Sequence, residues 1–89
     1  MTTTELRDAL AAAVAENPYM ILVDLTALTF IDSAATQMII GAYRVLFPEG
    51  GRLVLIHPAP AVFRTLELTG VNRLIPIFDS ADEAVTSAG

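Results

Sequence analysis

The residues whose types suggest chemistry in this chain of 89 residues lie in one turn, Asp32-Ser33. Asp32 is a good N-cap for the helix expected after it, and Ser33 falls in the first helical turn. Backbone N–H groups are unpaired there and the helix dipole is positive, so a phosphate on Ser33 would be tolerated. The phosphate would also place about −1.5 to −2 charges beside Asp32 and in any docked interface. We therefore predict a phosphorylation switch at Ser33.

Two other interpretations of this turn stay open. Asp32 and Ser33 are ordinary residues for the start of a helix, and a purely structural role would explain both. Nucleotide binding at the turn is the third hypothesis. It is weaker, because the chain contains no lysine and nothing near Asp32 offers a glycine-rich phosphate cradle.

Arrangements for catalysis or metal binding are missing from the sequence. There is no cysteine, and His57 is the only histidine, with no acid placed beside it. Disulfides and thiolate metal sites are therefore excluded, and His57 is interpreted as a strand-end residue. Walker loops, G-x-G-x-x-G, H-E-x-x-H and G-x-S-x-G motifs are also absent. We predict a protein that is not an enzyme and that uses no metal and no cofactor.

The charge pattern favours protein partners. Ten carboxylates outnumber five scattered arginines, and the net charge of −5 repels nucleic-acid phosphates and anionic lipid. No apolar stretch approaches the roughly 20 residues that span a bilayer, and the beginning of the chain lacks the features of a secretory signal. We expect no direct nucleic-acid binding, no membrane insertion and a cytoplasmic location.

The elements that must position the turn alternate between helices and strands. We expect helices over 4–16, 33–47, 60–68 and after Ser80, and strands over 19–25, 52–57 and 72–78. This alternation predicts a single α/β domain over residues 1–89, with helices packed on a mostly parallel sheet. Pro76 lacks an amide donor, which places the last strand at or near an edge.

Two segments carry more apolar residues than an exposed element needs. The run 19–25 is nearly continuous in apolar residues, which predicts a strand that is covered on both faces of the sheet. The helix over 33–47 is apolar nearly all round, whereas an ordinary surface helix has a distinct polar face. We expect this helix to contact something beyond its own core.

Several runs resemble, in the same order, the STAS domains of bacterial anti-sigma factor antagonists. These runs are 21–25, 30–33, 51–55, 66–70 and 79–84. The resemblance covers nearly the whole chain from about Leu6 and implies a STAS-like α/β fold. It also implies that Asp32 is the acid of the family motif and that Ser33 is its phosphoacceptor.

The resemblance further implies a partner-switching role. An unphosphorylated antagonist binds an anti-sigma factor that is also a serine kinase, which frees the sigma factor, and a phosphatase resets the system. We expect the partner-binding surface to lie around the turn. Its expected members are Asp24, Thr29, Phe30, Asp32, Ser33, Ala34, Ala35, Thr36, Gln37 and Met38.

The sequence departs from the family pattern in two places. Ala34 and Ala35 stand where a second hydroxyl residue and a glycine are expected, which gives weight to an alternative role. In that role the chain is a non-phosphorylated STAS subunit or adaptor of a membrane transporter complex. The strand pair that usually precedes the first helix is also missing here. A sheet edge left uncovered in this way favours a homodimer.

Overall fold

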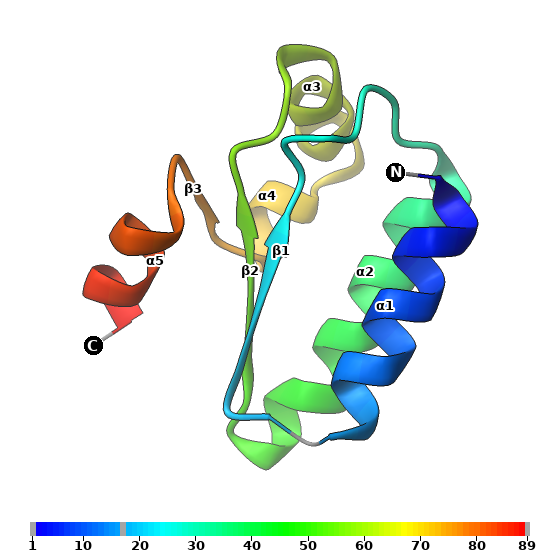
Figure 1. Ribbon diagram of the computed structural model, residues 1–89. Helices are drawn as coiled ribbons and strands as arrows, with labels where there is room; N and C mark the ends of the chain where they lie inside the picture. The colour runs from blue at the N-terminus through cyan, green and yellow to red at the C-terminus, as the bar shows by residue number, and fades with distance from the viewer. Residues whose placement is uncertain (1, 17, 89) are drawn as a thin grey trace.

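The fold is a three-stranded parallel sheet with helices on both sides, and the computed structural model describes it over residues 2–16 and 18–88. The helices are α1 (Thr3–Ala15), α2 (Ser33–Leu46), α3 (Pro60–Thr69), α4 (Val71–Leu74) and α5 (Ala81–Ala88), with a 3-10 turn η1 (Phe47–Glu49). The strands are β1 (Met20–Asp24), β2 (Arg52–Ile56) and β3 (Ile77–Phe78), in the spatial order β1-β2-β3. Figure 1 shows α1 and α2 on one side of the sheet and α5 on the other. The α/β fold with a parallel sheet is confirmed.

Local hydrogen bonds begin the first and last helices where the sequence indicates. Thr2 and Glu5 cap α1 reciprocally, since each side chain accepts from the other residue's N–H at 3.1 Å. The Ser80 hydroxyl accepts from the Glu83 N–H at 3.1 Å and starts α5. Gly70 ends α3 with a φ of 81°, a conformation that glycine adopts without strain.

The main core lies between the sheet and the pair α1 and α2. Ile21, Val23 and Leu55 point from the sheet into this core, and Ile39 of α2 is completely buried among them. Helix α1 packs along α2 and contributes the buried Leu6. The neighbour that we expected for the apolar surface of α2 is therefore in large part α1 of the same chain.

The prediction that the first strand is covered on both faces is wrong. The side chains of β1 alternate, with Ile21 and Val23 buried but Leu22 38% exposed. On that second face α5 covers Val54 and Ile56 of β2, which form a small cluster with Ala84. β1 is the edge strand farther from α5 and lies beyond its reach, as the separation between the two elements in Figure 1 shows.

The prediction of a strand over 72–78 is correct only at its end. Residues 71–74 form α4 instead, closed by the Ile75 N–H donating to the Val71 carbonyl at 2.8 Å. Val71 and Ile75 are both buried, so packing stabilises this turn although the residues have high strand propensity. Pairing with β2 begins after Pro76, and β3 lies at the sheet edge as predicted.

The uncovered face of β1 predicts unequal costs for two leucine truncations. Leu55→Ala removes a completely buried side chain and should lower the free energy of unfolding by about 2–5 kcal/mol. Leu22→Ala, on the neighbouring strand, should cost less than half as much. Urea unfolding followed by circular dichroism compares the two directly. Equal losses would contradict the structure, since they would mean that Leu22 is covered in solution.

Candidate functional site

The connection between β1 and α2 is anchored to the core. The Leu25 N–H donates to the Ile56 carbonyl at 2.9 Å and extends the strand pairing past β1, and the Leu28 N–H donates to the Leu25 carbonyl at 3.0 Å. Leu25, Leu28 and Ile31 are all buried. The segment between the last two is pushed outward, so that the Phe30 ring is 69% exposed. An apolar ring is thus presented on a backbone that is held in place from both sides.

Asp32 caps α2 with both its side chain and its backbone. Its Oδ1 accepts from the Ala35 N–H at 2.8 Å. Its carbonyl accepts from the Thr36 N–H at 3.0 Å and from the Thr36 hydroxyl at 2.9 Å. Asp32 has an extended backbone, with φ −102° and ψ 178°, as an N-cap requires. The predicted cap is confirmed.

Ser33 occupies the first position of α2 with its side chain exposed. Asp32 satisfies the third and fourth N–H groups of this helix, those of Ala35 and Thr36. Within residues 2–16 and 18–88, the N–H groups of Ser33 and Ala34 meet no acceptor. Two donors and the positive end of the helix dipole are therefore available beside the Ser33 hydroxyl.

Most of the predicted contact residues gather on the surface around this turn. The exposed members are Asp24, Thr29, Phe30, Ser33, Ala34 and Gln37, and the partly buried ones are Asp32 and Met38. The prediction needs correction at Ala35 and Thr36, each only 2% exposed. Both side chains turn into the core because they lie on the face of α2 that packs inside the domain, so a partner cannot reach them.

Asp24 and His57 lie at the same end of the sheet as the turn. The Asp24 Oδ1 accepts from the Thr26 N–H at 2.9 Å. Hydrogen bonds from the Thr26 side chain and then from its N–H hold the pKa of Asp24 below its ordinary value of 3.8, and the charge of His57 acts in the same direction. Thr26 was not among the predicted site residues. The signal that could have found it is the aspartate at the end of the strand, because an aspartate side chain often accepts from the N–H two residues later and forms an Asx turn.

His57 follows β2 in a left-handed conformation, with a φ of 48°. Its N–H donates to the Phe78 carbonyl at 2.8 Å, which continues the pairing with β3. Histidine is among the residues that adopt this region more often than most. The interpretation of His57 as a strand-end residue is confirmed. In the part of the chain that the structure describes, no three histidine, aspartate or glutamate residues form a group able to hold a metal ion.

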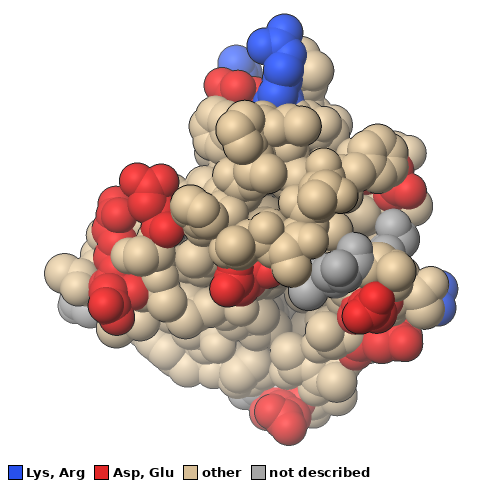
Figure 2. All heavy atoms as spheres, turned by 45° about the horizontal axis from the view of Figure 1, so that its top comes forward, with Lys and Arg blue, Asp and Glu red and all other residues tan. Residues whose placement is uncertain are grey.

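Charged side chains are unevenly distributed over this end of the molecule. Figure 2 brings this end toward the viewer and shows carboxylates gathered in groups at the left and at the right, with mostly uncharged surface and single carboxylates between them. Basic side chains appear only at the upper end and at the right-hand edge of that view. Among the described helices, none has the length and apolar content needed to cross a membrane.

The hydrogen bond from the Ala35 N–H to Asp32 predicts different stabilities for two substitutions of Asp32. Asp32→Ala leaves the Ala35 N–H without its acceptor and should cost about 0.5–2 kcal/mol of stability. Asp32→Asn keeps an acceptor oxygen at the same place and should lose much less. Thermal and urea unfolding of both variants measure this. If the alanine variant is as stable as the asparagine variant, the carboxylate does not cap α2.

The Asp24 environment predicts a pH dependence. Because the pKa of Asp24 is depressed in the folded state, its contribution to stability is present above about pH 3.8 and is lost as the pH falls through the folded value. Thr26→Val removes the donating hydroxyl and should raise the pKa of Asp24 toward 3.8. Titration of the carboxyl carbon by NMR measures this value. Thr29→Val, in the same connection, should leave it unchanged.

Comparison with known proteins identifies the family. The STAS domain family matches residues 1–84. An anti-sigma F factor antagonist of Paenibacillus polymyxa is 32% identical over 66 residues, which are 74% of this chain and 56% of that protein. An anti-sigma-B factor antagonist of Listeria monocytogenes is 28% identical over 76 residues, 85% of this chain and 67% of its own length. The chain thus spans little more than half of the first relative's length.

Solved structures show the same fold. The crystal structure of an anti-sigma factor antagonist from Mycobacterium paratuberculosis aligns with a TM-score of 0.82 and 30% identity, over 94% of this chain and 71% of that one. A structure from Thermotoga maritima, at 24% identity, aligns with a TM-score of 0.81 over 96% of this chain and 74% of that one, and supports the fold alone. From its sequence match and its fold together, this chain belongs to the STAS domain family.

Proposed function

We propose that this chain is an anti-sigma factor antagonist controlled by phosphorylation of Ser33. The observation that carries the proposal is the geometry at the start of α2. The Ser33 hydroxyl is exposed, and within residues 2–16 and 18–88 the N–H groups of Ser33 and Ala34 meet no acceptor, while Asp32 accepts from the next two amides. A phosphate can be accommodated there without displacing the cap. The names of the relatives supply the class of partner.

The proposed partner is an anti-sigma factor with serine kinase activity, which would use Ser33 as its substrate. The exposed Phe30 ring would be an apolar anchor for docking, with Thr29 and Gln37 beside the turn as polar contacts. A phosphatase would return the chain to its binding state. In this role the chain is a substrate and a binding partner in the cytoplasm and catalyses no reaction itself.

The switch would act through charge rather than through a change of fold. A phosphoserine at position 33 adds about −1.5 to −2 charges next to the Asp32 carboxylate. The helix dipole and two free amides compensate the charge in the isolated protein. In a docked complex the same charge would be desolvated and repelled by nearby acids, so the complex would dissociate while the antagonist stays folded.

The two alanines that depart from the family pattern are compatible with this switch. Ala35 is buried, so its methyl group faces the core rather than a docked partner. Its N–H still donates to Asp32, which shows that the cap forms without a glycine at this position. Ala34 is exposed and lacks the second hydroxyl of the family motif, so Ser33 is the only residue of positions 33–35 that can accept a phosphate. The relatives' names favour this role over a transporter subunit.

The proposal predicts one site of phosphorylation. With ATP and the serine-kinase anti-sigma factor from the same organism, mass spectrometry should find phosphate on Ser33 and none on the Ser33→Ala variant. Ser33→Asp should weaken binding of the anti-sigma factor at least tenfold, while the circular dichroism spectrum stays unchanged. Thr86→Asp, an exposed position on α5, is the charge-matched control and should bind normally.

Three results would overturn the proposal. They are phosphate on another residue, no phosphate at all, and a Ser33→Asp variant that unfolds. The last result would show that Ser33 is needed for the start of α2 and that its role is structural.

A further inference from the structure

The outer edge of β1 has unpaired backbone groups. The Leu25 N–H donates to the Ile56 carbonyl, so the odd-numbered residues of this strand direct their backbone groups toward β2. Because these directions alternate along a strand, the backbone groups of Met20, Leu22 and Asp24 point away from β2. β1 is the last strand on this side of the sheet, and within residues 2–16 and 18–88 nothing pairs with these groups.

This edge can be reached from solvent. Leu22 is 38% exposed, Asp24 is exposed and Met20 is partly buried. Natural proteins usually protect an edge strand with a bulge, a proline or a charge. The register of β1 with β2 is unbroken, and residues 20–23 include no proline and no charged residue. An unprotected edge of this kind is a template for pairing with another chain.

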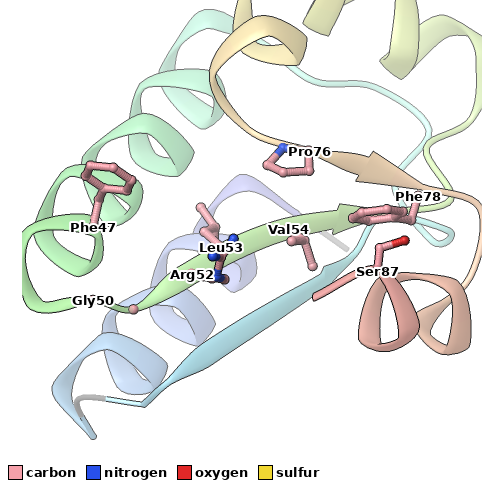
Figure 3. A pocket seen from close by; sticks show the side chains of 9 residues that line it. Phe47, Gly50, Arg52, Leu53, Val54, Pro76, Phe78 and Ser87 are labelled. Atoms are coloured by element: carbon pink, nitrogen blue, oxygen red, sulfur yellow. The ribbon is translucent and has the colours of Figure 1, made fainter. Parts of the chain in front are cut away.

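The opposite edge of the sheet is protected. β3 has only two residues, and Figure 3 shows Pro76, which has no N–H, where this strand begins. The cavity in the same figure, about 480 Å³ in volume, lies on this side, between η1, β2, β3 and the end of α5. Leu53 in its wall is only 2% exposed, so a peptide backbone has no open strand to pair with there.

A groove lies between the open edge and α1. Its volume is about 310 Å³, and its walls are residues 21–24 of β1 and Leu6, Ala9, Leu10 and Ala13 of α1. α2 packs against β2, and α1 packs beside α2 on the same side of the sheet (Figure 1). Because helices pack about 8–10 Å apart and strands lie about 4.8 Å apart, α1 covers the position that a further strand beside β1 would take.

The walls define what the groove can hold. Apart from Asp24 at one end they are apolar, and Ala9 and Ala13 are small enough to leave room for side chains beneath the helix. The one ion pair among the described residues joins Arg7 and Asp8, so no arginine there neutralises the Asp24 carboxylate. An extended segment with apolar side chains on one face and one basic side chain would complement these walls.

A second copy of the chain does not fit as the occupant. Pairing of β1 with β1 of another copy about a two-fold axis would bring each α1 over the strand of the other copy. Both helices would then require the same space above the joined edges. The homodimer that we expected would have to use another surface. The groove instead fits a segment that has no helix of its own above it.

We propose that this groove binds an extended basic peptide, which adds as a strand to the outer edge of β1. Its backbone would exchange hydrogen bonds with Met20, Leu22 and Asp24, as in strand addition to an exposed sheet edge. Alternate apolar side chains would pack beneath α1, and an arginine or lysine would pair with the Asp24 carboxylate. The net charge of −5 favours a basic ligand over an acidic one. The proposal does not rest on the antagonist role, since neither Phe30 nor Ser33 lines the groove.

NMR titration with blocked heptapeptides tests the proposal. The probes alternate valine and threonine and carry one arginine at either end. Binding should shift the Leu22 amide resonance and slow its exchange with solvent. Two further sets carry N-methyl groups on either the odd or the even amides. One set should lose binding and the other should keep it, because only alternate amides of an added strand face β1.

Matched variants test the two walls separately. Asp24→Asn keeps the oxygen that accepts from Thr26 and should weaken binding of the arginine peptides about threefold to tenfold, but not binding of peptides with citrulline in place of arginine. Asp82→Asn, exposed on α5, changes the net charge equally and should have no effect. Ala9→Leu should fill the groove and weaken binding about tenfold, whereas Ala12→Leu, exposed on the same helix and outside the groove, should not.

Three results would overturn the proposal. The first is that millimolar peptide leaves the Leu22 amide unshifted. The second is that both methylated sets bind as well as the unmodified peptides. The third is that Asp24→Asn or Ala9→Leu loses no more affinity than its matched control.

Discussion

The parallel pairing of β1 with β2 is the interaction on which the rest of the molecule depends. It runs in unbroken register from Met20 opposite Arg52 to Asp24 opposite Ile56, and the Leu25 N–H carries it one step further. Because the strands are parallel, both carboxyl ends meet at one edge, and the connection to α2 leaves from there. The same pairing leaves the backbone N–H of Leu55 directed away from β1, and this N–H donates to the Pro76 carbonyl beside β3. The position of the Ser33 turn and the placement of β3 therefore have one common origin.

The features that the sequence predicts well are those governed by neighbouring residues. The caps at Thr2, Asp32 and Ser80 depend on hydrogen bonds that span three residues, and all three form as the spacing indicates. The glycine at position 70 ends its helix for an equally local reason, its freedom to adopt a positive φ. In these places local geometry and tertiary packing favour the same structure.

The predictions fail where contacts between elements that are distant in the sequence determine the structure. An apolar run such as 19–25 does not reveal which strand lies at the edge, and only the position of α5 over β2 leaves Leu22 open. Val71 and Ile75 are strand-forming residues, yet their burial stabilises a helical turn over residues 71–74. At the site, the Asp32 cap and the start of α2 at Ser33 form as predicted. The side chains of Ala35 and Thr36 point inward because of the orientation of α2 about its own axis against the sheet. The predicted contact residues were chosen without knowledge of this orientation.

The way in which the connection between β1 and α2 is held has a consequence for the divergence of such domains. Leu25, Leu28 and Ile31 fix its backbone in the core, while the side chains of Thr29 and Phe30 between them face outward. Substitutions at the two outward positions change the surface without removing a core contact. Under the proposed role, copies of this domain would acquire different partners through these positions and keep one common fold.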